Sequence, residues 1–175
     1  PRSTLFPYTT LFRSFKNETE VVMPGTNAKM NEFQALMGEM VLRHMPEIVD
    51  SRRRIYEQYR QLLANVPGIK LPPRAPAGVD YNYAYIPVEI DEAQFGTSRN
   101  QLYEELKTYN IFARRYFYPL LNNFACYQSV SVSDPLTTAR SVAERILTLP
   151  IYASLSADDI DRICRIIISK SRIAK

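Results

Sequence analysis

The sequence predicts an α+β fold, in which a long helical connector precedes a small domain of helices over an antiparallel sheet. Two observations lead to this prediction. Before residue 70, apolar residues recur at spacings of three and four, which is typical of helices. After residue 78, short segments rich in β-forming residues are interspersed with helical segments that carry N-cap signals. A proline-rich stretch at 71–78 separates the two parts, so we expect a connector over 15–70 and the small domain over 71–175.

Residues 1–14 are expected to be non-native. The stretch from Thr4 to Ser14 matches the conceptual translation of a sequencing adapter, and the chain does not begin with Met. Without the two positive charges of Arg2 and Arg13, the formal net charge of +4 falls to +2. The alternative is a native amphipathic arm, because four residues of this stretch are apolar, namely Leu5, Phe6, Leu11 and Phe12.

Two helices are predicted in the connector. The first carries one apolar stripe, and Asn27, just before it, is expected to accept from its free backbone N–H groups. Pro46 interrupts or restarts the helix, because proline suits a first helical turn and disfavours a helix interior. The second helix ends before Pro67 and Gly68. The stripe of the first helix consists of Phe33, Leu36, Met37, Met40, Val41 and His44, and that of the second of Ile48, Ile55, Tyr59, Leu62 and Leu63.

Short strands are predicted at three places in the small domain. Residues 81–90 are rich in β-forming residues, and Pro87 favours an edge strand or a bulge there. Residues 111–117 are predicted to form a second strand, and residues 147–150 a short strand or a turn. The tyrosines of the first segment are interpreted as packing residues with hydrated hydroxyl groups, and they are Tyr81, Tyr83 and Tyr85.

Three helices are predicted around these strands. Ser98 and Gln101 have the spacing of a capping box and open the first of them. Pro135 is well placed at the first position of the second helix, directly after Asp134. Ser156 caps the last helix, whose inward-facing residues are expected to be Ile160, Ile163, Cys164 and Ile167.

Composition and charge exclude several kinds of partner. The basic run from Arg52 to Arg54 is typical of a solvated helix face, and no docking motif for nucleic acid accompanies it. No apolar run has the length of a membrane span, so no membrane partner is predicted. Two separated cysteines, Cys126 and Cys164, fit a reduced cytoplasmic location. His44 is the single histidine, which excludes a histidine metal site and favours a core or capping role.

A longer motif runs from Gly25 to Gly38, with the sequence Gly-Thr-Asn-Ala-Lys-Met-Asn-Glu-Phe-Gln-Ala-Leu-Met-Gly. It resembles the signature Gly-x-Asn-x-(Arg/Lys)-Met-x-(Glu/Asn)-x-Gln-Ala-x-(Met/Ile)-Gly of the DegT/DnrJ/EryC1/StrS family, the sugar aminotransferases that depend on pyridoxal 5'-phosphate (PLP). Together with later segments that follow in the family's order, the resemblance covers residues 20–170. Those segments are 52–62, 110–120 and 147–159.

The resemblance implies the small C-terminal domain of an aspartate-aminotransferase-like PLP enzyme of fold type I. It implies PLP as cofactor, a homodimer, and transfer of an amino group from an amino acid such as glutamate to a keto group of a nucleotide-linked deoxysugar. In the family, the lysine that forms the Schiff base with PLP lies ahead of the signature, in a Ser-x-x-Lys setting. No lysine of this chain has that setting. We therefore expect a C-terminal fragment, assign no catalytic residue and predict no transaminase activity for this chain alone.

Four residues are predicted through the resemblance to bind ligands. Asn27 matches an asparagine that reaches the cofactor phosphate of the other subunit, although a simple helix cap would use the same side chain. Lys29 is either a point charge for the diphosphate of the sugar nucleotide or a solvated lysine. Arg114, Arg115 and Tyr116 form a second candidate cluster, in which Arg115 and Tyr116 are assigned to substrate binding, because a guanidinium beside an aromatic ring suits phosphate or carboxylate recognition. An edge strand with one hydrated face gives the same pattern, and relatives have a His-Tyr pair where this chain has Tyr116 and Phe117.

Two alternative functions stay open at this point. One is a PLP-dependent sugar dehydratase of the same family, in which a histidine replaces the Schiff-base lysine. The other is a non-catalytic α+β interaction module. A module should be a soluble monomer with a polar surface, whereas a fragment should expose the apolar face of its first helix and aggregate.

Overall fold

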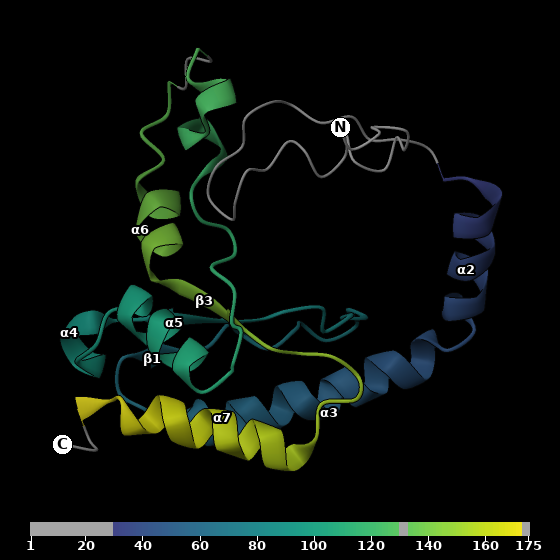
Figure 1. The fold of residues 1–175 in the computed structure, drawn as a ribbon, viewed down its shortest axis with the longest axis horizontal. Coiled ribbons are helices and arrows are strands. Elements are labelled where there is room, and N and C mark those ends of the chain that lie inside the picture. Colours follow the sequence, from purple (N-terminus) through teal and green to yellow (C-terminus); the bar gives the residue numbers. More distant parts are fainter. Residues whose placement is uncertain (1–29, 130–132, 173–175) are drawn as a thin grey trace, which may run out of the picture.

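The computed structural model describes residues 30–129 and 133–172 (Figure 1). The segment 1–14, Asn27 and Lys29 lie outside these ranges, so the predictions made for them stay predictions. No helix of the described ranges is long and apolar enough to cross a membrane. The elements are α2 (Glu32–Leu42), α3 (Met45–Leu63), β1 (Ile69–Lys70), β2 (Ile86–Ile90), α4 (Glu92–Phe95), α5 (Arg99–Thr108), the 3-10 turns η1 (Leu121–Asn123) and η2 (Ala125–Tyr127), α6 (Thr137–Arg145), β3 (Ile146–Leu149) and α7 (Ala157–Ser169).

Helix α2 begins at a capping box that the sequence analysis did not predict. The side chain of Asn31 accepts a hydrogen bond from the backbone of Gln34 at 2.9 Å, and the Gln34 side chain accepts one from the backbone of Asn31 at 2.9 Å. Because this reciprocal pair satisfies two free donors, Asn31 is the cap of α2. Asn27, which the sequence analysis places just before this helix, lies outside the described residues, so its role stays a prediction.

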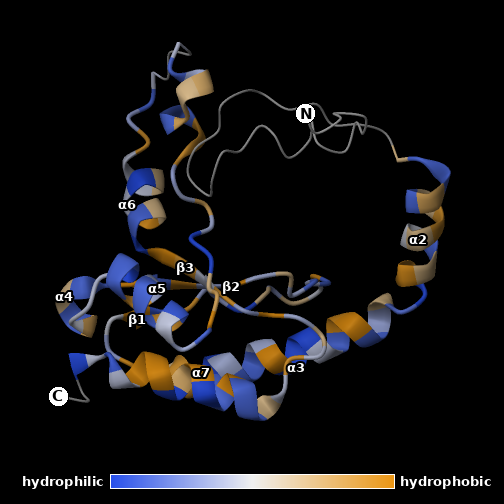
Figure 2. Cartoon of the chain, viewed as in Figure 1, coloured by the Kyte–Doolittle hydropathy of each residue, from blue (hydrophilic) through white to orange (hydrophobic). Residues whose placement is uncertain are grey.

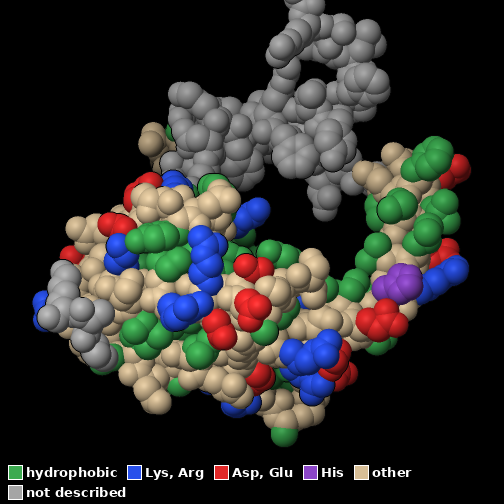
Figure 3. Space-filling view, turned by 60° about the horizontal axis from the view of Figure 1, so that its bottom comes forward, with side chains coloured by type: hydrophobic (Ala, Val, Ile, Leu, Met, Phe, Trp, Pro, Cys, Tyr) green, Lys and Arg blue, Asp and Glu red, His purple; other side chains and the backbone are tan. Residues whose placement is uncertain are grey.

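The apolar side chains of α2 are exposed. Figures 1 and 3 show this helix standing away from the remaining described residues, and Figure 3 shows hydrophobic side chains along it. Phe33 is 82% exposed, and no residue of α2 is buried. The other exposed members of this face are Leu36, Met37, Met40 and Val41. An apolar face of this kind marks a surface that another protein segment covers, so the expected exposure of this helix is confirmed.

The joint between α2 and α3 corrects the interpretation of His44. This residue occupies the N-cap position of α3, but its side chain makes no capping hydrogen bond. Its ring is exposed, and Nδ1 lies 3.3 Å from a carboxylate oxygen of Glu47. The predicted capping role is wrong because the His44 side chain caps no helix. The predicted core role is wrong because the helix face that carries His44 is exposed to solvent. Pro46 restarts the helix in the first turn of α3, as predicted.

The sheet has the order β1–β2–β3, and both pairs of strands are antiparallel. β2 is therefore the central strand, although Pro87 within it predicts an edge strand or a bulge. Opposite Pro87, Thr148 exchanges its backbone hydrogen bonds with Arg114 rather than with β2. The backbone of Pro87 consequently points toward β1, which ends at Lys70 opposite Glu89. Proline has no backbone N–H, and no described strand lies on the side to which that group would point. Pro87 therefore lies at a local edge of the sheet, where a proline is accommodated.

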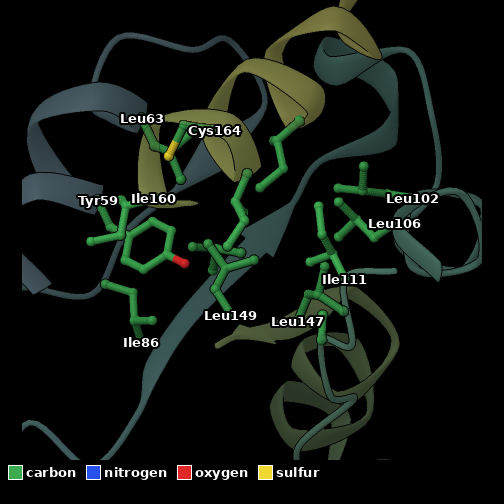
Figure 4. Packing of buried hydrophobic residues seen from close by; sticks show 14 of the residues in the cluster. Tyr59, Leu63, Ile86, Leu102, Leu106, Ile111, Leu147, Leu149, Ile160 and Cys164 are labelled. Carbon is green, nitrogen blue, oxygen red and sulfur yellow. The ribbon is translucent and has the colours of Figure 1, made fainter. Parts of the chain in front are cut away.

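The core lies between the sheet and the helices α3, α5 and α7 (Figure 4). Figure 2 shows hydrophobic residues recurring along α3 and α7, and Figure 4 shows the ring of Tyr59 among Ile86, Leu149 and Ile160. Burial of each such side chain contributes about 1.5–3 kcal/mol relative to exposure. The inward face predicted for the last helix is confirmed, because its four named residues are buried in α7.

Two predicted elements differ in the structure. Residues 111–117 do not form a strand, and only Arg114 makes an isolated bridge, to Thr148. Helix α6 begins at Thr137, because the Asp134 carboxylate accepts from the backbone of Leu136, which has a φ of 52°. Pro135 therefore lies before the helix rather than in its first turn. The capping signals at Ser98 and Ser156 are confirmed.

Candidate functional site

A pocket of about 330 Å³ opens where β2 begins and β3 ends. Its charged and aromatic lining comes from segments far apart in the sequence, which the antiparallel register of β2 and β3 brings together. Ring-bearing and cationic side chains dominate this lining, and they belong to Tyr85, Phe112, Arg114, Tyr116 and Tyr152. Pockets lined by aromatic rings with a few placed polar groups are the usual form of a small-molecule site.

The backbone places Arg114 and Tyr116 on the pocket side of one short segment. Arg114 donates its N–H to the carbonyl of Thr148 at 2.9 Å and accepts from the N–H of Thr148 at 2.7 Å. The chain then turns, because the N–H of Tyr118 donates to the carbonyl of Arg115 at 2.8 Å. The bridge to β3 and the turn that follows it place the side chains of residues 114 and 116 at the same pocket.

Tyr116 is fixed from three directions. Its hydroxyl oxygen accepts a hydrogen bond from Nη1 of Arg114, whose guanidinium carbon lies 5.2 Å from the centre of the Tyr116 ring. The ring of Tyr85 meets it edge-on at 5.9 Å, and the ring of Phe117 stacks on it at 5.0 Å. Such ring pairs favour one orientation of the phenol, which in turn holds the guanidinium of Arg114.

The pocket carries positive charge. No Asp or Glu is among the described residues that line it. Within residues 30–129 and 133–172, Arg114 forms no ion pair, and its one side-chain hydrogen bond goes to the neutral hydroxyl of Tyr116. An arginine has five N–H donors, so most of them remain available for an anion. Chemically, this arrangement can bind a phosphate or a carboxylate attached to a ring.

Arg115 is directed away from this pocket, toward α5. Its Nη1 donates to the side-chain oxygen of Asn100 at 3.4 Å, and its guanidinium lies 4.5 Å from the ring centre of Tyr103 and 5.5 Å from that of Tyr118. The structure therefore separates the two residues that the sequence analysis paired. Tyr116 lines the pocket, whereas Arg115 packs between the turn and α5.

Tyr85 is a pocket residue that the sequence analysis did not assign to a site, whereas Arg114 belonged to the candidate cluster of Arg114, Arg115 and Tyr116. Tyr85 was interpreted as a packing residue, but it is 47% exposed and contacts Tyr116. Its contact depends on the pairing of β2 with β3, which local sequence does not specify.

The lysines of the described ranges lie beside carboxylates. Lys107 donates to Glu104 at 3.1 Å and Lys170 contacts Glu105 at 2.8 Å, and these carboxylates raise the pKa of both ammonium groups. Lys70 lies 3.7 Å from Glu89. Each of these described lysines is thus close to a carboxylate. No catalytic step is assigned to them.

Comparison with known proteins places this architecture among sugar aminotransferases. The dTDP-4-amino-4,6-dideoxy-D-glucose transaminase of Escherichia coli is 40% identical over 156 residues, which cover 88% of this chain and 42% of that enzyme. The Shigella dysenteriae enzyme of the same name is 37% identical and covers 84% of this chain and 40% of its own length. The chain thus spans about two fifths of the length of these curated relatives.

Solved structures give the same result. The structure of DesI in the presence of its TDP-sugar product has a TM-score of 0.76 and 36% identity, over 85% of this chain and 38% of that protein. The aminotransferase TlmJ from Streptoalloteichus hindustanus has a TM-score of 0.70 and 29% identity, over 86% of this chain and 39% of its own. These neighbours confirm the predicted α+β fold as part of a fold type I enzyme. The family profile matches residues 8–168, and the chain belongs to the DegT/DnrJ/EryC1/StrS aminotransferase family.

Proposed function

We propose that the complete protein is a PLP-dependent aminotransferase that transfers an amino group to a keto carbon of a nucleotide-linked deoxysugar. This chain supplies part of the helical connector and the small C-terminal domain. The observation that carries the proposal is the 40% identity over 88% of the chain to an enzyme named as a dTDP-4-amino-4,6-dideoxy-D-glucose transaminase. Glutamate as the amino donor, the homodimer and the cytoplasmic location stay predictions.

The exposed face of α2 supports the proposal that residues beyond the described ranges complete the enzyme. A row of apolar side chains on one helix has no covering partner among the described residues. In the complete protein, this face packs against the large domain or against the second subunit. The Schiff-base lysine belongs to the large domain, so this chain alone has no transaminase activity.

Asn27 and Lys29 keep the roles that the family resemblance gives them. Asn27 contacts the cofactor phosphate across the dimer, because an amide donor beside free helix N–H groups favours an oxyanion. Lys29 meets the diphosphate of the nucleotide sugar as a point charge. PLP supplies the electron sink of the reaction when it is bound, while these residues only hold anionic groups in place.

The test is an assay of the complete protein with PLP. Purified enzyme is given dTDP-4-amino-4,6-dideoxy-D-glucose and 2-oxoglutarate, and the formation of glutamate is measured. We expect glutamate from the complete protein and none from the chain of residues 15–175. Loss of the sugar hydroxyl without transfer of nitrogen would instead identify the dehydratase. The absence of any PLP-dependent reaction would favour the interaction module and contradict the proposal.

A further inference from the structure

We infer that Arg115 is a positioning residue for the candidate pocket. Through the rings of Tyr103 and Tyr118, it holds the segment that carries Arg114 and Tyr116 against α5. The inference goes beyond the proposed function, because it concerns how an irregular segment beside β3 keeps its place. It gives Arg115 a role other than the substrate binding predicted from the sequence.

The segment that follows Arg114 has few backbone attachments among the described residues. Arg114 exchanges two hydrogen bonds with Thr148, and the N–H of Tyr118 donates to the carbonyl of Arg115 at 2.8 Å. The second attachment closes the turn itself and connects it to no other element. The position of the turn relative to α5 therefore depends on side chains.

Two arginines connect the turn to α5 through aromatic rings. The guanidinium carbon of Arg115 lies 4.5 Å from the ring centre of Tyr103 on α5, and its Nη1 donates to the side-chain oxygen of Asn100 at 3.4 Å. At the start of α5, the guanidinium carbon of Arg99 lies 4.7 Å from the ring centre of Tyr118, and that of Arg115 lies 5.5 Å from it. A cation within about 6 Å of a ring centre is attracted by the face of the ring.

The residues that hold the turn are themselves immobilised in the small domain. Tyr103 is 7% exposed and Arg99 is 2% exposed. Arg99 also donates Nη1 to the carbonyl of Ile146, the first residue of β3, at 2.9 Å. Cation–ring contacts are stronger where the groups are removed from water. Arg115 therefore connects the turn to a buried and ordered part of α5.

Apolar packing contributes little where Tyr118 meets Arg99. A cavity of about 490 Å³ lies at this contact, and both residues belong to its lining. Most of the lining is polar or charged, and it includes the carboxylates of Asp91, Glu92 and Glu144. Because such a cavity offers little apolar surface to bury, the contacts between cation and ring carry more of the attachment.

Hydrogen exchange of the complete protein, measured by mass spectrometry of its peptides, tests this role. The peptide over residues 112–118 contains the amides of Arg114 and Tyr118, which donate to described carbonyls. Arg115→Met keeps an unbranched side chain but removes the charge, whereas Arg115→Lys keeps the charge. Arg165→Met is the matched control, because Arg165 is exposed and its described hydrogen bond stays within α7.

A second pair of variants tests the ring. Tyr118→Phe keeps the aromatic face that attracts the two guanidinium groups, and Tyr118→Leu replaces it by an apolar side chain without one. Circular dichroism checks that each variant is folded. Should Arg115→Met fail to fold, the comparison of the two Tyr118 variants carries the test.

We expect Arg115→Met and Tyr118→Leu to accelerate exchange over residues 112–118 by about threefold to thirtyfold, because each removes cation–ring contacts that oppose local opening. Arg115→Lys should restore part of the protection, and Tyr118→Phe should restore nearly all of it. Arg165→Met should leave this peptide unchanged. Exchange over α7 should be the same in all these proteins, because α7 packs on α3 and not on the turn.

The inference is overturned if neither Arg115→Met nor Tyr118→Leu accelerates exchange over residues 112–118. Equal acceleration in the Met and Lys variants, or in the Leu and Phe variants, would show that charge or ring face does not hold the turn. Equal acceleration over α7 would reduce Arg115 to a contributor to overall stability. The proposed function fails separately, since the exchange is measured whether or not the complete protein transfers nitrogen.

Discussion

Arg114 and Thr148 exchange two backbone hydrogen bonds, with N···O distances of 2.9 and 2.7 Å, although neither a strand nor a helix contains Arg114. This single bridge fixes an irregular segment to the edge of the sheet. The pocket therefore depends on a contact between residues that are far apart in the sequence.

Hydrogen exchange should report this bridge directly. The amide protons of Arg114 and Thr148 are both donated to backbone carbonyls, so we expect them to exchange slowly. The amide of Phe112, an exposed residue with no described backbone partner, should exchange quickly. Nuclear magnetic resonance of the folded chain measures the three rates. Equal rates at Arg114 and Phe112 would mean that the segment is not attached to β3.

The exposed face of α2 should make the isolated chain associate with itself. Sedimentation velocity of the chain is expected to show species that grow with concentration. Replacing Leu36 and Met40 by Gln should reduce this association, because glutamine keeps helix propensity while removing apolar surface. Glu39→Gln, on the same helix, is the control and should have no such effect. A wild-type chain that stays monomeric at every concentration would support the interaction module instead.

Gly68 is predicted to be intolerant of a side chain. Its φ is +79°, and an added Cβ would lie 2.3 Å from the backbone nitrogen of Phe95. Gly68→Ala should therefore lower the free energy of unfolding by about 2 kcal/mol or more, from overpacking and backbone strain. Urea denaturation measures the loss. Gly38→Ala is the matched control, since no described atom lies within 4 Å of its added Cβ and alanine favours the helix. Similar losses in both variants would contradict the packing seen at Gly68.

The free energy of unfolding should fall at alkaline pH, because a cysteine thiol and a tyrosine phenol are buried in the core. Burial raises the pKa of the Cys164 thiol from 9.0 to about 12, and burial also raises the pKa of Tyr59. Above the ordinary thiol pKa, the unfolded chain loses this proton while the folded chain keeps it. The stabilisation that the Cys164 thiol contributes to the folded state is thus fully present below pH 9.0 and is lost as the pH rises toward 12.

The expected slope for one such group approaches about 1.4 kcal/mol for each pH unit. Urea denaturation of the wild-type chain and of Cys164→Ala, at neutral pH and at about pH 10, measures it. The variant lacks the thiol, so its stability should fall less with pH than that of the wild type. Identical pH dependence in the two proteins would show that the Cys164 proton is not retained on folding.

Local signals in the sequence predicted the helices well. The capping box of Ser98 and Gln101 and the cap at Ser156 depend on residues three apart, so their geometry is set within one helical turn. At α2, two asparagines precede the stripe, and Asn31, which has Gln34 three residues later, forms the capping box. The start of α6 was misplaced for a local reason, the hydrogen bond between Asp134 and Leu136.

Features that depend on pairing between distant segments were less predictable. β-forming composition predicted a strand at 111–117, but β3 provides only one bridge to this segment, at Thr148. Pro87 can lie in the central strand because β1 ends before it reaches the position opposite this proline. The sequence of β2 gives no indication of the length of β1. In the site, the sequence placed Arg114, Arg115 and Tyr116 in one cluster, whereas the structure directs Arg114 and Tyr116 to the pocket and Arg115 toward α5.

The central claim is that the complete protein moves nitrogen onto a nucleotide sugar. The most direct measurement is mass spectrometry of the sugar product after incubation of the complete protein with PLP, the dTDP-4-keto-6-deoxy sugar and nitrogen-labelled glutamate. The account predicts a dTDP-amino sugar that carries the label, formed only when the complete protein is present. An unlabelled sugar, or one that has lost a hydroxyl group without gaining nitrogen, would contradict it.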